Sequence, residues 1–124
     1  MTTSVVRAIK TSQQEAAATD LDSWGARPGA VGEAATSGMS LLARQDLPQV
    51  GTTGIWDCTP GRWTVAARPV TEVSFIVAGR GRVTDSDGEV HEISVGDVLV
   101  LPAGWSGQWE IVERLRKIYV LAPE

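Results

Sequence analysis

The pattern of apolar and polar positions changes near residue 38. Beyond it, short apolar or alternating runs recur about every 8–12 residues, with Gly or Pro between them. This spacing is typical of antiparallel β-sandwiches and barrels. The predicted strands are 39–43, 62–66, 72–78, 82–85, 89–93, 98–101, 108–112 and 116–121. The pattern therefore predicts an all-β domain over residues 39–124.

Residues 1–38 carry no comparable pattern and are rich in Ala, Thr, Ser and Gly. A short helix is predicted at 12–18, because Ser12 and Glu15 have the spacing of a capping box and three alanines follow. The Gly and Pro residues of 25–29 then interrupt any regular element. We expect an N-terminal arm that is loosely structured or partly helical, with plain disorder as the alternative.

The length and net charge of the chain favour a single domain and argue against a nucleic-acid-binding protein. The 124 residues suit one domain, and a net charge of −4 argues against binding to a phosphate backbone. The chain shows neither an apolar run near the roughly 18 residues of a membrane span nor a secretory signal. A single cysteine, Cys58, excludes an internal disulfide. We therefore expect a cytoplasmic protein that binds neither nucleic acid nor membranes.

Two glycine-framed motifs carry a resemblance to a known superfamily. Gly61, Glu72 and Gly79 frame the first, and the segment GDVLVLPAG at 96–104 forms the second. Together they resemble the two motifs of the cupins, and GIWDCTPGRW at 54–63 is similar to the ureidoglycine aminohydrolase-type small cupins. The resemblance covers about residues 50–121. It implies a cupin jelly-roll β-barrel that encloses a small-molecule pocket.

The sequence departs from this family at the metal-binding positions. Counting along the motifs, the three histidine positions fall on Ala67, Pro69 and Gly107, and only the glutamate position, Glu72, is retained. A transition-metal site needs three or four converging ligands. We therefore expect no metal and no other cofactor.

Glu72 has two interpretations. If it faces the barrel interior, apolar walls raise its pKa and suit it to general acid–base catalysis, provided that a partner such as Lys117 compensates its burial. If the short spacer turns it to the rim, it pairs with Arg68. Lys117 and Tyr119 share one face of a strand in a two-residue period, and the first interpretation makes all three catalytic.

The predicted pocket lining consists of Trp63, Ser74, Trp105, Trp109 and Cys58. The tryptophans either fill the barrel as core or form an aromatic ligand pocket, since small barrels are usually filled by side chains. Cys58 is expected to be a buried thiol rather than a reactive one.

Three further residues or segments receive simple interpretations. Trp56 is expected at an exposed sheet edge. His91 is expected on the surface, far from the second motif. The charged run at 113–117 is expected to be a solvated loop.

Two functions from different classes follow. The first is a metal-independent enzyme that acts on a small polar metabolite by proton transfer, as in isomerisation, cyclisation, dehydration or lyase chemistry. The second is a non-catalytic small-molecule-binding or interaction module with a Trp-lined or plugged barrel. Because an open barrel has sheet edges to protect, we expect a homodimer in either case.

Overall fold

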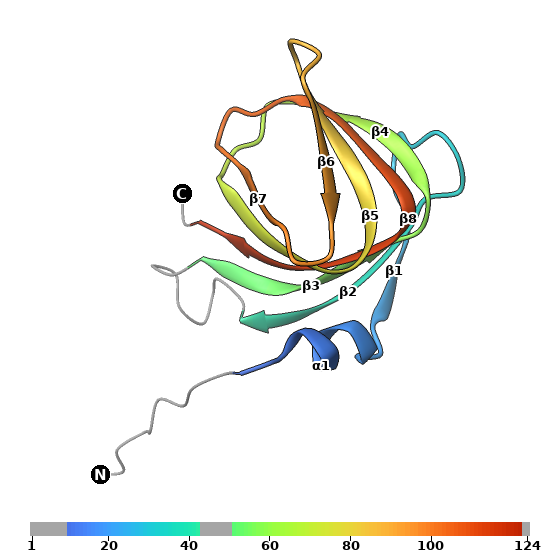
Figure 1. Ribbon diagram of the computed structural model, residues 1–124, viewed down its shortest axis with the longest axis vertical. Coiled ribbons are helices and arrows are strands. Elements are labelled where there is room, and N and C mark those ends of the chain that lie inside the picture. Colours follow the sequence, from blue (N-terminus) through green and yellow to red (C-terminus); the bar gives the residue numbers. More distant parts are fainter. Residues whose placement is uncertain (1–9, 43–50, 123–124) are drawn as a thin grey trace.

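The computed structural model describes residues 10–42 and 51–122 and is built almost entirely from antiparallel strands. Its elements are α1 (Gln13–Ala18), β1 (Asp22–Ala26), β2 (Ala35–Leu42), β3 (Thr52–Cys58), β4 (Gly61–Val65), β5 (Glu72–Asp85), β6 (Val90–Ser94), β7 (Val98–Leu101) and β8 (Gly107–Leu121). The strands form one sheet in the order β1-β2-β3-β8-β5-β6, with β4 paired to β8 and β7 paired to β5. Figure 1 shows the sheet curling into an open barrel. The prediction of an all-β barrel is confirmed.

The two longest strands, β5 and β8, pair with each other along most of their length. Each joins two strands that the sequence pattern separates, 72–78 with 82–85 and 108–112 with 116–121. The β5–β8 register shifts at three places between Ile76 and Gly81, which breaks the alternation of inward and outward side chains. Gly79 lies in this irregular region at φ 77°, and a Cβ there would collide with the carbonyl of Arg114. Strands β5 and β8 are therefore continuous, although the alternation of apolar and polar residues along them is interrupted.

The charged run at 113–117 is not the solvated loop that we predicted. It lies inside β8, and Leu115, Arg116 and Lys117 are all buried. The prediction was wrong because each of the two buried cations has an acidic partner on a neighbouring strand, Asp57 for Arg116 and Glu72 for Lys117.

The arm contains the predicted helix and also two strands. The Ser12 hydroxyl accepts a hydrogen bond from the Glu15 amide at 3.1 Å, as the capping box predicts. Residues 22–26 and 35–38, however, belong to β1 and β2, and β2 pairs with β3 in register Thr36 to Cys58. Sequence patterning missed β1 because all five of its residues are exposed and Gly25 adjoins a register shift. The strand predicted at 39–43 is part of β2, and residue 43 lies outside the described residues.

The sheet carries a hydrophobic core on each side. Inside the barrel, the buried residues include Cys58, Trp63, Ile76, Trp109 and Leu115. On the outer side, α1 covers a smaller core formed by Ala16, Ile55 and Val77. No helix among the described residues is long and apolar enough to span a membrane.

Arg116 fixes α1 to the outer side of the sheet. Its Nη1 donates to the carbonyls of Ala16, Ala17 and Thr19 at 3.0, 3.1 and 2.6 Å. Its Nε donates to Asp57 at 2.9 Å. Since the last carbonyls of a helix have no intrahelical partner, this guanidinium caps the C-terminus of α1.

Candidate ligand pocket in the barrel

A cavity of about 380 Å³ lies on the inner side of the sheet. The inner faces of β3, β4, β5 and β8 form its walls, and β1 with the segment after it completes them. Its charged and aromatic lining residues are Arg27, Arg68, Glu72, Lys117, Trp24, Trp56, Trp63, Trp109 and Tyr119. A concave, largely aromatic site with a few convergent polar groups is the usual form of a small-molecule pocket.

Strand register explains why the polar groups converge. Lys117 and Tyr119 lie two residues apart on β8, opposite Trp56 and Gly54 of β3. Glu72 begins β5 and is brought alongside β8, where it pairs with Leu121. All three predicted catalytic side chains, Glu72, Lys117 and Tyr119, therefore line one cavity.

Glu72 forms the ion pairs of both interpretations, with Lys117 and with Arg68, but it is buried and does not lie at the rim. One carboxylate oxygen, Oε2, accepts from Lys117 Nζ at 2.5 Å and from the Ser74 hydroxyl at 2.7 Å. The other, Oε1, accepts from Arg68 Nη2 at 2.8 Å. Glu72 and Lys117 are 6% exposed each, so this is a buried ion pair on the cavity wall.

The titration of the pair differs from our expectation for Glu72. Burial alone would raise the pKa of Glu72, but Lys117, Ser74 and Arg68 together hold that pKa below its ordinary value. Burial also lowers the pKa of Lys117, against the opposing attraction of Glu72. The expected raised pKa of Glu72 is therefore wrong, because the carboxylate lies among donors rather than against apolar walls alone.

Tyr119 supplies a neutral donor beside the pair. Burial and the nearby Glu72 charge raise the pKa of its phenol, which keeps the hydroxyl protonated at neutral pH. Its ring lies where the side chain of residue 54 would be, and a Cβ there would come within 2.7 Å of the Tyr119 hydroxyl. Gly54 therefore makes room for the phenol.

The tryptophans are both core and pocket wall. Trp63 and Trp109 are cross-strand partners that stack at 6.1 Å, and Trp56 lies 6.2 Å from each. Lys117 Nζ lies 4.6 Å from the Trp56 ring and 4.9 Å from that of Trp109. The edge position expected for Trp56 is wrong, since β3 lies between β2 and β8.

Other predicted lining residues lie outside this cavity. Ser74 is buried behind Glu72, and Cys58 packs in the barrel core, where burial raises its pKa to about 11. Trp105 faces a different groove. Sequence reasoning also missed Trp24 and Arg27, because both come from the arm.

The cavity does not suit the divalent metal that a cupin resemblance raises. Among the described lining residues, Glu72 is the one carboxylate, and its two oxygens already accept hydrogen bonds from three side chains. Cationic Arg68 and Lys117 lie against it and would repel a metal ion. We therefore derive no chemistry through a metal at this position.

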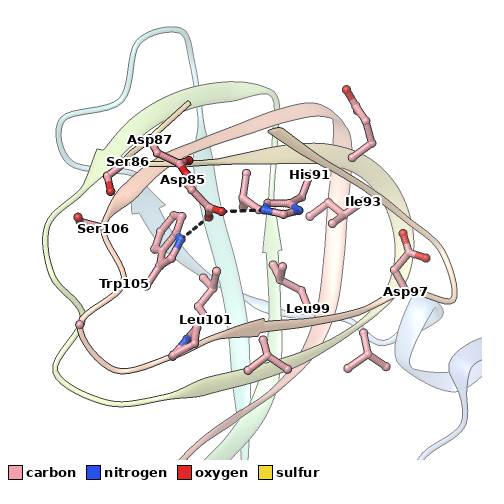
Figure 2. Close-up of a pocket in the computed structure, with 16 residues that line it drawn as sticks. Asp85, Ser86, Asp87, His91, Ile93, Asp97, Leu99, Leu101, Trp105 and Ser106 are labelled. Atoms are coloured by element: carbon pink, nitrogen blue, oxygen red, sulfur yellow. Dashed lines mark hydrogen bonds and ion pairs between the residues drawn. The ribbon is translucent and has the colours of Figure 1, made fainter. Parts of the chain in front are cut away.

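A second groove, of about 720 Å³, lies between the β5–β6 hairpin and β7. Figure 2 shows Asp85 between Trp105 and His91 in this groove. Asp85 accepts from Trp105 Nε1 at 2.8 Å and contacts His91 Nε2 at 2.9 Å. His91 is exposed as expected, but its expected distance from the second motif is wrong, because the hairpin bends back over Trp105.

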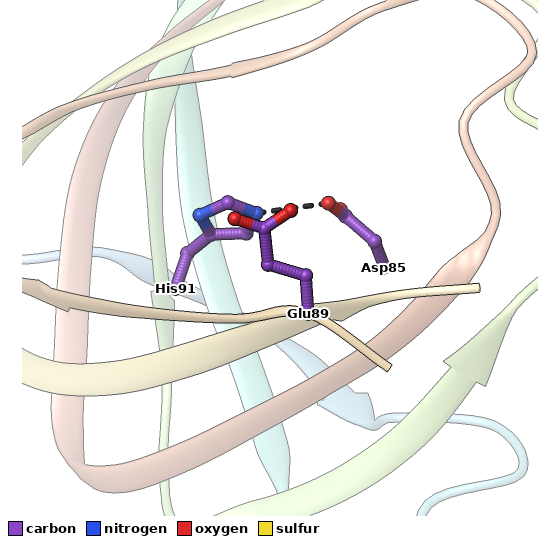
Figure 3. Close-up of side chains that lie close together, drawn as sticks. All are labelled: Asp85, Glu89 and His91. Atoms are coloured by element: carbon purple, nitrogen blue, oxygen red, sulfur yellow. Dashed lines mark hydrogen bonds and ion pairs between the residues drawn. The ribbon is translucent and has the colours of Figure 1, made fainter. Parts of the chain in front are cut away.

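Glu89 lies close to Asp85 and His91, as Figure 3 shows, and the ligand atoms of the three side chains are within 4.8 Å of one another, so they could hold a metal ion. Hydrogen bonds from Trp105 and His91 lower the pKa of Asp85, and the bond to Asp85 raises the pKa of His91. The side chain of His91 is 44% exposed, so the trio behaves as a solvated ion-pair cluster. The smaller cavity, with its buried ionic network, is the stronger candidate site.

The fold and this pocket define a single-domain cupin. The model of the EutQ-like cupin domain matches residues 47–119, and the chain belongs to that family. No curated protein matches the sequence.

Solved structures show the same fold. The Clostridium difficile EutQ protein is 19% identical, with a TM-score of 0.64 over 73% of this chain and 69% of that one. A cupin-like protein from Thermotoga maritima is 14% identical, with a TM-score of 0.71 over 85% of this chain and 80% of that one. A DUF861 family protein from the same organism is 30% identical, with a TM-score of 0.52 over 54% of this chain and 75% of that one.

Proposed function

We propose that this protein is a metal-independent cupin that binds a small polar metabolite in the 380 Å³ cavity and acts on it by proton transfer. The observation that carries the proposal is the buried Glu72–Lys117 pair on the cavity wall, with Tyr119 beside it. Isomerisation, cyclisation, dehydration and lyase reactions need only such transfers. A cytoplasmic location belongs to the same proposal and is supported by the single, buried and free Cys58.

The roles of the three residues follow from their surroundings. Lys117 is the proton-transferring group, because burial lowers the pKa of its ammonium below the ordinary value and so makes its proton easier to release to a substrate. Ionised Glu72 is the positioning residue that holds the Lys117 amine in place. Tyr119 stays protonated and donates a hydrogen bond to the developing negative charge of the substrate.

Lys117 can be tested directly, because the chain contains two lysines, Lys10 and Lys117, and Lys10 is exposed. An NMR titration of lysine-labelled protein should show Lys117 with a pKa below the ordinary lysine value of 10.5. Glu72→Gln should lower the pKa of Lys117 further, since Glu72 raises it in the native protein. A Lys117 that titrates at the ordinary value would contradict the proposed role.

Catalysis is tested by solvent exchange. The protein is incubated in D2O with a panel of small polar metabolites, and deuterium incorporation at carbon is followed by NMR. Wild type and Lys10→Met should exchange the substrate, whereas Lys117→Met should lose the exchange. Equal exchange by Lys117→Met would exclude Lys117 as the proton-transferring group.

One observation favours non-catalytic binding as a second candidate. The Glu72 carboxylate is engaged by three side chains, and Lys117 also packs on two indoles, as in a pair that serves structure alone. Quenching of tryptophan fluorescence by a metabolite, with no deuterium incorporation into it, would support this alternative.

We also propose a homodimer that forms through the outer face of β5, β7 and β8. Val73, Phe75, Val98, Val100 and Val120 are 37–64% exposed there, and they are neighbours across the strands. A two-fold axis brings the same patch of two copies together, so an exposed apolar patch on three adjacent strands can be covered by its counterpart on a second copy. Strand β7 pairs only with β5 among the described strands, so a second copy would also cover its free edge.

A further inference from the structure

The proposed ligand cavity contains more positive than negative charge. Arg27, Arg68 and Lys117 line it against one carboxylate, Glu72, although the chain as a whole has a net charge of −4. Lys117 and Glu72 neutralise each other at 2.5 Å. The two guanidinium groups therefore leave an excess of positive charge in a partly enclosed site, which favours an anion.

Arg27 reaches the cavity from the segment that follows β1. Its backbone amide donates to the Ala34 carbonyl at 2.9 Å, and its carbonyl accepts from the Ala30 amide at 3.2 Å. This turn places its guanidinium carbon 5.2 Å from the centre of the Trp63 ring. Its Nε is buried and has no hydrogen-bond partner among the described residues.

Arg68 is held at the cavity by the second motif. Its amide donates to the Trp105 carbonyl at 3.0 Å, and its carbonyl accepts from the Gly104 amide at 2.8 Å. Its Nη2 donates to Glu72, whereas its Nε is buried without an acceptor among the described residues. A buried donor that lacks an acceptor is costly and rare, so two of them at one cavity need a physical explanation.

We propose that the cavity is a receptor for a small organic carboxylate, which the guanidinium groups of Arg27 and Arg68 bind. The planar guanidinium matches a carboxylate in geometry, and the walls of Trp56, Trp63 and Trp109 suit a flat, apolar ligand body. The cavity volume of about 380 Å³ limits the ligand to a small molecule. This inference names the substrate class of the proposed function and rests on the same cavity.

The test is isothermal titration calorimetry with acetate, fumarate and benzoate, each compared with its uncharged amide, and with inorganic phosphate. At least one carboxylate should bind, and its amide should bind about tenfold or more weakly, because a charged hydrogen bond is lost. Failure of all three carboxylates, equal binding of the amide, or tighter binding of phosphate would overturn the proposal.

Arginine variants locate the binding site. Arg27→Gln should weaken the binding of the carboxylate by about tenfold or more. Arg27→Lys should weaken that binding less, because it keeps the positive charge but loses the planar guanidinium that can donate two hydrogen bonds to one carboxylate. Arg62→Gln is the control, because Arg62 is exposed on β4 and does not line the cavity. Unchanged affinity in Arg27→Gln would overturn the assignment.

The two proposals fail separately. The NMR titration of Lys117 requires neither Arg27 nor a ligand, so it tests proton transfer alone. Deuterium exchange into a neutral substrate, with no binding of any carboxylate, would keep the proposed function and remove the inference drawn here. Arg68→Gln should reproduce the loss in Arg27→Gln, with circular dichroism showing that it folds.

Discussion

At the scale of single residues, the Glu72–Lys117 pair determines both the chemistry and the stability of the pocket. Removing one member leaves the other buried without its partner. We expect Glu72→Gln to destabilise the fold by about 3–5 kcal/mol, the usual cost of breaking a buried pair. Glu72→Gln combined with Lys117→Met should regain much of that loss, because no buried charge then remains. Urea unfolding of wild type, Glu72→Gln, Lys117→Met and the double variant measures the free energies of this double-mutant cycle. If the losses of the two single variants add up in the double variant, the expected coupling is absent.

The same pair predicts a pH dependence of stability. The pKa of Glu72 is lowered in the folded state, so its stabilising contribution is present above its ordinary pKa of 4.5 and is lost as the pH falls through the lower, folded-state value. The stability gap between wild type and Glu72→Gln should therefore be full at neutral pH and should narrow in acid. A gap that is constant from neutral to acidic pH would contradict the lowered pKa.

At the scale of elements, Arg116 joins helix α1 to β8. We expect Arg116→Met to release the helix and to destabilise the protein by about 2 kcal/mol, since charge-assisted hydrogen bonds to three carbonyls are lost. Hydrogen–deuterium exchange in residues 13–19 should rise. Arg114→Met is the matched control, because Arg114 also binds Asp57 but is exposed and does not contact the helix. Equal exchange in the two variants would rule out the capping role.

Sequence patterning predicted the elements where alternation is regular and missed them where it is not. The hairpin 82–93 and the strand at 98–101 alternate or are flanked by turn residues, and they are found with small changes of boundary. Strand β1 has no buried residue, and the run at 113–117 is rich in charge, so local patterning missed β1 and did not join the predicted strands at 108–112 and 116–121 into one. Only partners distant in sequence, Asp57 and Glu72, explain the buried cations of β8.

In the candidate site, too, local sequence patterns predicted some residues, and others depend on contacts distant in sequence. Period-two spacing on one strand placed Lys117 and Tyr119 together, and the cupin motif marked Glu72. The low pKa of Glu72 could not be predicted, because it depends on three donors arranged in space. Arg27 comes from a segment without any periodic signal, so its place at the cavity is known from the structure alone.

At the scale of the whole molecule, the apolar outer face predicts the oligomeric state. Wild type should be a dimer in sedimentation or light-scattering measurements, and the double variant Val98→Asp, Val100→Asp should be monomeric. Val90→Asp is the control, since Val90 is 51% exposed but lies on β6, outside the patch. A wild-type monomer at every concentration measured, or a dimer that survives the double substitution, would exclude this interface.

Arg116 and Lys117 are adjacent on β8, and this restricts where residues can be inserted into or deleted from the chain. Adjacent residues of a strand point to opposite sides, so one cation serves the helix and the next serves the pocket. Insertion or deletion of one residue just before them would exchange their sides and place each beside the wrong acid. Relatives that keep both features should therefore vary in length at the turns, such as 86–88, and preserve the residue count of β8.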